Sequence, residues 1–552
     1  MKRLLLVLAL LISAAGAALA DSPALDDAAL RVIPIQNQGR IKPIDTFARE
    51  SVLTITGKER FDGRAPLDLI LTWLDDPKKA ASMMVIDVSR QDVRAALGLP
   101  ADARYTSIDT LLSTPTFEKQ AREVMRKQQA SEELTELDRQ IGRLTTRVSL
   151  LQSLLTLEAF TVVPDKQSLA NPWHPLSSLI GPTSPLDAGE SAAIIGSVKS
   201  LVTAHAARDT AAFTKASQAL SAQLSAVGPG PDPVVLAREV QYNALHPFGK
   251  AWMLYLAAVL VLGAAGALGN RRLYGLGVFI AVAGLIMHVY GFYLRCTIAG
   301  RPPVTNMYES VIWVSLGVMV FALLLEAVFR AQALVLPAAV AATICLIVAD
   351  NVTSILDPAI NPLTPVLRSN FWLTIHVLTI TLSYGAFLLA TAIGHVSLFT
   401  YGFHPKDRAR QRSLHQQLYK TVQLGVMLLA AGTILGGVWA NYSWGRFWGW
   451  DPKEVWALIA LLGYLAVLHG RYAGWLKDFG FSAGCVVAYC GVLMAWYGVN
   501  FVLGAGLHSY GFGDGGQLYV AVGVALDLLY VAVMGLRYRA TRMAAAGGEA
   551  AE

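Results

Sequence analysis

The stretch "AWMLYLAAVLVLGAAGALG", residues 251–269, is a long apolar run that contains no charged side chain. A helix needs about 20 such residues to cross the hydrocarbon core of a bilayer. Because further runs of this kind follow, the sequence predicts an all-α polytopic membrane protein with about nine transmembrane helices. We place the other spans near residues 273–294, 309–329, 332–350, 372–400, 421–440, 454–470, 480–503 and 516–536.

The composition agrees with a chain embedded largely in lipid. Of its 552 residues, 54% are hydrophobic and 15% are charged, whereas soluble domains carry about 25% charged residues. The four cysteines, Cys296, Cys345, Cys485 and Cys490, form no CxxC or CxxCH spacing. Without these spacings, the cysteines provide neither a disulfide framework nor a zinc site, and they do not allow covalent attachment of heme to the chain itself. No basic module suggests a nucleic-acid partner.

The first 245 residues differ in character from the rest. Residues 1–20 resemble a secretory signal, with Lys2 and Arg3 before an apolar stretch and an A-x-A cleavage site at Ala18–Ala20; an uncleaved anchor is the alternative. Residues 21–245 are predicted to form a mostly helical extracytoplasmic domain. In "GRIKPIDTFARE" (39–50), a turn precedes a helix that Asp45 or Thr46 can cap.

A leucine-rich stripe dominates the middle of this domain. Its apolar residues alternate three- and four-residue steps, as in a heptad repeat. An Ala-rich helical region at 188–227 can return against it, so an intradomain helical hairpin and a dimeric coiled coil are both open. The stripe consists of Leu134, Leu137, Ile141, Leu144, Val148, Leu151 and Leu155.

The loop charges predict the orientation of the membrane domain, residues 246–545, and of its tail, residues 546–552. Cytoplasmic loops carry an excess of Lys and Arg. Nine spans after an external domain put the C-terminus and the basic loops inside, with only scattered positive charges outside. The inner charges are Arg271, Arg272, Arg330, Lys406, Arg408, Arg410, Arg412, Lys420, Arg471, Lys477, Arg537, Arg539 and Arg542.

An aromatic loop, "WGRFWGWDPKE" (444–454), lies on the predicted outer side between two spans. Trp444, Trp448 and Trp450 suit either an interfacial aromatic belt or a platform for a large planar ligand. The "DPKE" sequence that follows predicts Asp451 as the N-cap of the next helix, because proline and an early acidic residue come directly after it.

Histidines are expected at two depths of the membrane. His376 near the outer end of the fifth span and His508 after the eighth flank the aromatic loop in sequence. Two imidazoles above an aromatic platform suit the iron of a planar macrocycle, although either histidine alone fits a packing role. His469 and His395 share an inner depth and can form a second site, with His288 as a supporting group of the outer one. His404 and His415 are expected to be solvated.

With these residues, the chain resembles a known family. "WGRFWGWDPKEVW" (444–456) resembles the WWD motif of heme-handling proteins, and "AGRPPVTNMYES" (299–310) resembles the CcsA (ResC) branch of c-type cytochrome biogenesis, System II. The resemblance covers residues 246–545. It implies that His376 and His508 are the external heme ligands and that His469 is the membrane-embedded ligand. "GRIKPIDTFARE" is similar to the external segment fused ahead of CcsA-like domains in some relatives.

The resemblance also implies an activity. CcsA with its partner CcsB (ResB) exports heme b across the cytoplasmic membrane and presents it to the CxxCH thiols of apocytochrome c, as part of a holocytochrome c synthase. Trp444, Trp448 and Trp450 would lie against the porphyrin, and Arg446 or Arg301 can pair with a propionate. The N-terminal domain and the loop would then be periplasmic.

The chain departs from the fused CcsBA pattern, because no CcsB-like segment that could supply the second inner ligand is recognisable. Either a separate CcsB chain supplies it, or His395 does so within this chain. Three other classes stay open at this point: a b-type electron carrier in the membrane, a System I heme-loading protein, and a transporter or scaffold with an aromatic belt.

Overall fold

The computed structural model describes residues 25–549, apart from 182, 303, 354, 364–370, 505 and 507–514. Residues 1–20, the predicted signal, therefore lie outside the described residues, and so does His508. The chain divides into two compact units at the boundary between Gln241 and Tyr242. Each unit is described by itself below.

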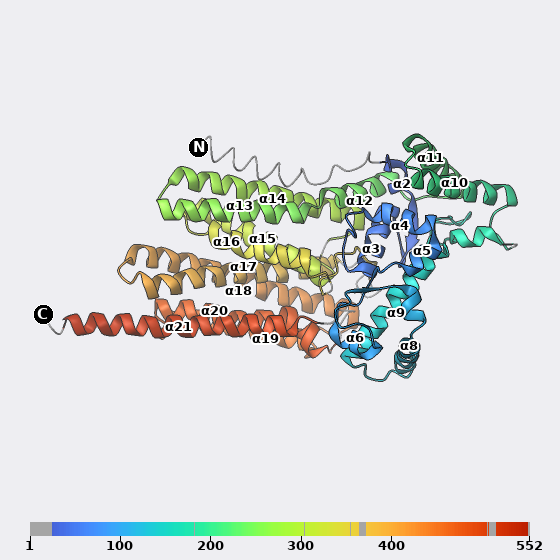
Figure 1. Ribbon diagram of the computed structural model, residues 1–552. Coiled ribbons are helices and arrows are strands. Elements are labelled where there is room, and N and C mark those ends of the chain that lie inside the picture. Colours follow the sequence, from blue (N-terminus) through green and yellow to red (C-terminus); the bar gives the residue numbers. More distant parts are fainter. Residues whose placement is uncertain are drawn as a thin grey trace. The chain divides into compact units, whose positions relative to one another are not determined.

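The first unit consists mostly of helices (Figure 1). It also contains two short antiparallel strand pairs, β1 with β2 and β3 with β4. Its elements are α2 (Ala28–Arg31), β1 (Pro34–Asn37), β2 (Arg40–Pro43), α3 (Ile44–Thr56), α4 (Pro66–Asp75), α5 (Pro77–Ser82), β3 (Ile86–Asp87), α6 (Gln91–Leu97), β4 (Tyr105–Thr106), α7 (Ile108–Leu112), α8 (Pro115–Gln129), α9 (Glu136–Leu155), η1 (Leu176–Ile180), α10 (Ala188–Ala206), α11 (Thr210–Val227) and α12 (Pro233–Leu245), which crosses the unit boundary.

The predicted leucine stripe lies on α9, where Ile141, Leu144, Val148 and Leu151 are buried in the core of the unit. Two details differ from the prediction. Leu134 precedes the helix, because Thr135 is its N-cap and forms a capping box with Asp138. The Ala-rich region forms its own hairpin, α10 with α11, while α9 packs against α8 and α3. The stripe thus serves the core of this unit.

The start of α3 also differs from the prediction. Pro43 is its N-cap, and no side chain caps the helix. Asp45 is already inside the first turn, where it pairs with Arg49 at 2.9 Å, and Thr46 donates a hydrogen bond to Glu239 at 2.8 Å. Both polar side chains therefore tie α3 to neighbouring groups, and the prediction that one of them caps the helix is wrong.

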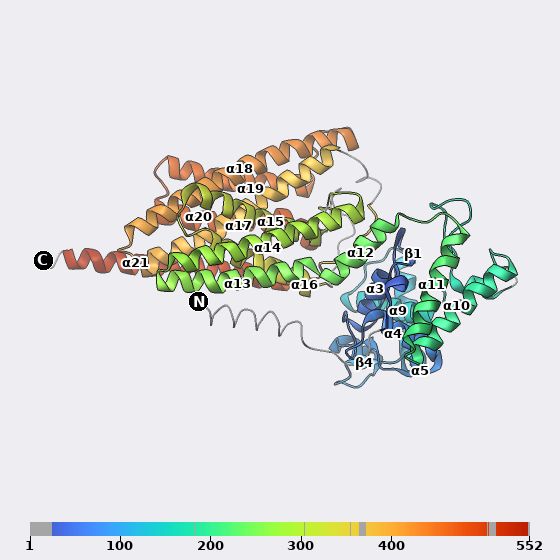
Figure 2. The same cartoon turned by 90° about the horizontal axis from the view of Figure 1, so that it is seen from above.

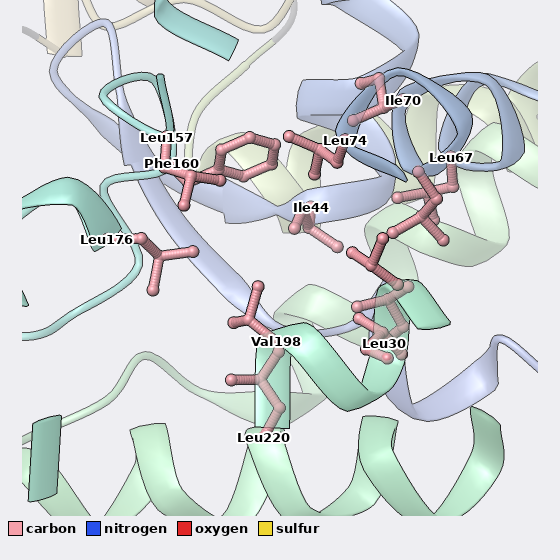
Figure 3. A pocket seen from close by; sticks show the side chains of 13 residues that line it. Leu30, Ile44, Leu67, Ile70, Leu74, Leu157, Phe160, Leu176, Val198 and Leu220 are labelled. Atoms are coloured by element: carbon pink, nitrogen blue, oxygen red, sulfur yellow. The ribbon is translucent and has the colours of Figure 1, made fainter. Parts of the chain in front are cut away.

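A small cavity lies in the core of the first unit (Figure 3). The side chains that line it are apolar and include Leu30, Ile44, Leu67, Phe160 and Leu220. An apolar cavity of this kind gives a ligand no polar group by which to be oriented. We assign it to the packing of the core.

The second unit is a bundle of long apolar helices, as predicted (Figures 1 and 2). Eight helical segments of the described chain are long and apolar enough to cross a membrane, and the predicted span at 332–350 is a shorter apolar helix. The all-α polytopic fold is therefore confirmed. Its helices after α12 are α13 (Pro247–Leu268), α14 (Arg271–Ala299), α15 (Met307–Phe329), α16 (Val335–Asn351), α17 (Phe371–Phe403), α18 (Arg408–Trp444), α19 (Pro452–Tyr472), α20 (Asp478–Leu493), η3 (Met494–Leu503) and α21 (Gln517–Glu549).

The helices of this unit pack mainly as sequence neighbours. Helix α13 pairs with α14, α17 pairs with α18, and α19 pairs with α20, while α17 also contacts α15, α20 and α21. The segment η3 continues α20 in π-helical geometry up to Gly504, whose left-handed backbone ends the helix. The α17–α18 pair places His376 beside Trp439, which in turn contacts Trp444 at the start of the aromatic loop.

Candidate functional site

His376 lies on α17 in contact with the C-terminal half of α18. Its Nδ1 is 2.7 Å from the carbonyl oxygen of Gly432. The ring of Trp439, one turn beyond Gly436 on α18, is nearly parallel to the imidazole, with ring centroids 6.3 Å apart and planes 8° apart. Trp439 is buried and meets the ring of Trp444 edge-on at 4.7 Å. An aromatic path therefore connects His376 to the start of the loop.

The loop itself exposes much of its aromatic surface. Trp444 ends α18, and Gly445 follows in a left-handed conformation. The rings of Trp448 and Trp450 stand almost perpendicular, 6.0 Å apart. Trp450 has a φ of 58° and is 70% exposed. A bulky residue in that backbone region is a strained exception, so the surrounding contacts must hold the indole in this exposed position.

Asp451 and Glu454 order the loop. Asp451 is the N-cap of α19 and accepts a hydrogen bond from the backbone N–H of Lys453 at 3.0 Å. Glu454 accepts from the backbone N–H groups of Gly449 at 2.8 Å and Asp451 at 3.2 Å. Together they form a capping box. The predicted N-cap is thus confirmed, and the reciprocal contribution of Glu454 extends it into the loop.

The segment that leads to His508 also approaches this loop. A Cβ atom on Gly506 would lie 2.3 Å from Oδ2 of Asp451 and 2.9 Å from Cδ of Pro452, at a φ of 100°. Only glycine fits so close an approach. Lys453 Nζ donates a hydrogen bond to Oδ1 of Asn500 at 3.1 Å, which joins α19 to η3. His508 itself lies outside the described residues.

The two arginines considered for an anionic group have different surroundings. Arg301 donates to the carbonyl oxygen of Asn361 at 2.8 Å and lies 3.4 Å from Oε2 of Glu309. Arg446 lies over the ring of Trp444, 5.8 Å from its centroid, and its Nη1 is 3.8 Å from Oε1 of Glu454. Arg446 is therefore the one that belongs to the aromatic loop.

The two histidines predicted to share an inner depth, His469 and His395, also differ from each other. His469 is exposed on α19, and its Nδ1 is 2.7 Å from the carbonyl oxygen of Leu465. Both ring nitrogens of His395 have partners: Nδ1 is 2.7 Å from the carbonyl oxygen of Thr391, and Nε2 is 2.5 Å from Oδ1 of Asp527 on α21. The structure therefore leaves His469 open on one side and ties His395 to a neighbouring helix.

Two histidines are part of the packing. His288 is buried between the hydroxyl of Tyr255 at 3.3 Å and the carbonyl oxygen of Ile312 at 3.1 Å. His415, which we expected to be solvated, is 5% exposed and accepts a hydrogen bond from Nε of Arg471 at 2.8 Å. That expectation was wrong, because α18 starts earlier than the predicted span and carries His415 into its contact with α19 and α20.

Two features of the surroundings of His376 were not predicted from the sequence. Trp439 lies inside an apolar run and carried no loop or motif signal. Its position three residues after Gly436, on the face that meets His376, is visible only once α17 and α18 are paired. The glycines of α18 were also overlooked, although three of them within six residues of a helix, Gly432, Gly436 and Gly437, are a recognisable signal of close helix contact in membranes.

Comparison with known proteins identifies a family that the chain resembles. The sequence model of the family described as "Cytochrome C assembly protein" matches residues 304–508, a stretch that contains His376, the aromatic loop and His469 and ends at His508. The site and the bundle thus define a membrane protein of the cytochrome c assembly class.

Individual relatives narrow this class. CcsA of Prochlorococcus marinus strain MIT 9303, a cytochrome c biogenesis protein, is 32% identical over 270 residues, which are 42% of this chain and 83% of that protein. CcsA of strain MIT 9312 is 28% identical over 317 residues, 50% of this chain and 97% of that protein. The chain belongs to the CcsA family of cytochrome c biogenesis proteins.

A longer relative resembles more of the chain. Protein NrfI of Wolinella succinogenes is 29% identical over 492 residues, which are 86% of this chain. Only 53% of NrfI is covered, so the chain spans about half the length of that protein. The similarity extends beyond the CcsA-like region into the first unit.

Proposed function

We propose that the chain carries heme b outward across the cytoplasmic membrane and presents it at the periplasmic face to apocytochrome c, as part of a System II holocytochrome c synthase. The observation that carries this proposal is the placement of His376 beside an ordered, exposed tryptophan loop in a chain of the CcsA family. The first unit and the loop would lie in the periplasm and the C-terminus in the cytoplasm.

The hydrogen bond of His376 supports a role as iron ligand. A carbonyl oxygen can only accept, so Nδ1 of His376 donates its proton to Gly432. In a neutral imidazole the lone pair then belongs to Nε2, the nitrogen farther from the backbone. Histidines that bind metals are commonly fixed in this way by a partner on the other ring nitrogen. We propose His508 as the second external ligand, and Gly506 beside Asp451 supports this assignment.

The loop supports recognition of the porphyrin. Trp444, Trp448 and Trp450 would bury part of its flat surface, and removing that area from water is worth several kcal/mol at about 25 cal/mol per Å². Arg446, at the base of the loop, is suited to a heme propionate. Asp451 contributes by ordering the loop through its hydrogen bond at the start of α19.

The chemistry of thioether formation is consistent with a chain that delivers heme to another protein. Each thiol S–H of an apocytochrome CxxCH motif adds across a vinyl double bond of heme: a C–S bond forms, the proton goes to the vinyl carbon, and no oxidant is consumed. The four cysteines of this chain form no disulfide, and they lie in the apolar helices α14, α16 and α20 and not in the loop sequence. Heme would therefore leave the chain without covalent attachment to it.

For the inner heme we propose His469 as the ligand from this chain. Its Nδ1 contact with Leu465 directs the lone pair to Nε2, in the same way as in His376. Because both ring nitrogens of His395 have partners, we favour a separate CcsB/ResB-like membrane protein as the source of the second inner ligand.

The test is an absorption spectrum of the protein purified with its partner. We expect His376→Ala to lower external heme and to abolish assembly of c-type cytochromes, and added imidazole to restore part of it by filling the vacant axial position. His404→Ala, which removes an exposed histidine after the end of α17 that is assigned to neither site, serves as the matched control. Normal cytochrome c levels and an unchanged spectrum in His376→Ala would contradict the proposal.

A further inference from the structure

Three glycines of α18 face either α17 or the aromatic loop. An added Cβ on Gly432 would lie 2.8 Å from Cα of Ile380, which is backbone of α17. An added Cβ on Gly436 would lie 2.6 Å from Cε1 and 2.8 Å from Nδ1 of His376. An added Cβ on Gly437 would lie 2.5 Å from Cζ of Phe447 in the aromatic loop. These contacts differ in kind, because only the first is between helix backbones.

We propose that Gly436 is a positioning residue for the external heme ligand. The bare backbone of α18 at this point sets the depth and tilt of the His376 imidazole, and Gly437 provides the same support for Phe447. The two adjacent glycines thus align the ligand and the loop from one turn of one helix. This inference rests on the proposed function and identifies residues that act through His376.

The geometry around the ring leaves it little freedom. The Nδ1–Gly432 hydrogen bond at 2.7 Å holds one edge of the imidazole, the backbone of Gly436 lies against the same edge, and Trp439 lies parallel to the ring. An alanine methyl at 436 must push the ring away, which lengthens that hydrogen bond and turns Nε2. Ligand–metal bonds depend on this orientation, so a shift in a supporting group weakens metal binding.

Packing of helices alone does not account for Gly436. Small residues allow helices in membranes to approach closely, and Gly432 against Ile380 is such a contact. At Gly436 the nearest atoms belong to the imidazole of His376, so an alanine there displaces that ring and not the backbone of α17. Glycine is less favourable than alanine inside a helix, so its presence at 436 calls for a specific reason, and the close approach of the His376 ring supplies one.

The experiment compares two glycine variants in the purified complex. Gly436→Ala should lower external heme per protein by roughly tenfold, the size of effect seen for groups that orient metal ligands, and should shift the absorption spectrum of the heme that remains. Gly463→Ala, in the interior of α19 where an added Cβ would have no neighbouring atom within 4 Å, is the matched control and should leave both unchanged. Equal heme content and identical spectra in the two variants would overturn the proposal.

A double variant separates positioning from packing. In a His376→Ala background supplied with imidazole, Gly436→Ala should cause little further loss of heme, because the free imidazole is not held by α17. If Gly436 served only helix packing, the loss would be the same in both backgrounds, and this result would also overturn the inference.

The outcomes distinguish this inference from the proposed function. If His376→Ala removes external heme and Gly436→Ala does not, only the positioning role fails. If neither variant changes heme content, the proposed ligand role of His376 fails as well. Gel filtration of each variant with its partner establishes that folded complex is being compared.

Discussion

At residue 451, a carboxylate caps a helix and closes a loop at the same time. Asp451 accepts from the backbone of Lys453, and its own N–H donates to Glu454, which also holds Gly449. Asp451 is 6% exposed, and Gly506 lies against its Oδ2 atom. One side chain therefore connects the aromatic loop, the start of α19 and the segment after η3.

We predict that Asp451→Ala destabilises this region by about 1 kcal/mol, the usual cost of losing an N-cap, and lowers heme content. Asp451→Asn should retain most of both, because asparagine is an equally good N-cap. Hydrogen exchange of peptides from the loop and heme per protein are the measurements. An Asn variant as defective as the Ala variant would show that the charge, and not the cap, is what matters.

Features of single residues were predictable where they depend on the neighbouring sequence, and not where they depend on contacts between helices. Local rules predicted the cap at Asp451, because an N-cap, a proline and an acidic residue lie within four positions. The partners of His376, the burial of His415 and the role of Trp439 depend on how α17, α18 and α19 meet. No local pattern encodes those contacts.

Helix α21 is attached to α17 by polar contacts. Asp527 meets His395, the hydroxyl of Tyr530 donates to the carbonyl oxygen of His395 at 2.9 Å, and Arg537 lies 3.9 Å from the ring centroid of Phe403. Polar pairs within a membrane are costly unless they are satisfied. The His395–Asp527 pair therefore reads as an attachment of α21 to α17.

We expect His395→Ala to loosen α21 without removing the inner heme. The helix should exchange its backbone hydrogens faster, because Asp527 loses its partner, while heme per complex stays at the unmodified level. His469→Ala is the comparison variant and should lose inner heme. Loss of inner heme in His395→Ala would instead make His395 the second ligand.

The elements themselves were largely predictable. Apolar runs of sufficient length identified the membrane-spanning helices. The helix pairing in the first unit was not predictable: α9 has an apolar stripe that fits several partners, and tertiary packing selected α8 and α3. Periodicity determines which face of a helix is buried, but it does not determine the neighbour.

At the scale of the whole chain, the first unit carries ionic contacts that make its stability depend on pH. Asp68 on α4 lies 2.8 Å from Nε2 of His205 on α10 and 2.9 Å from Nη1 of Arg208. The hydrogen bond from His205 and the charge of Arg208 lower the pKa of the Asp68 carboxyl. This carboxylate joins two helices that are far apart in sequence.

The contribution of Asp68 to the stability of the first unit should disappear in acid. Its pKa in the folded chain lies below the value of about 3.9 expected when unfolded, so the stabilisation is complete above about pH 4 and is lost as the pH falls through the folded pKa. Hydrogen exchange of α4 and α10 in the full chain, measured from pH 6 downward, should show the loss. Asp68→Asn should flatten this dependence, and an unchanged profile in that variant would assign it to other carboxyls.

Because η3 (Met494–Leu503) is wound as a π-helix, the number of residues in it, and not only their identity, constrains where the helix ends at Gly504. Such a wide winding accommodates an additional residue within a helix, and one residue corresponds to about 100° of rotation in an α-helix. Deleting a single residue between 494 and 503 would let the stretch relax to ordinary winding and swing the exit at Gly504 toward a different neighbour. Natural relatives should therefore tolerate changes of side chain here far better than changes in spacing.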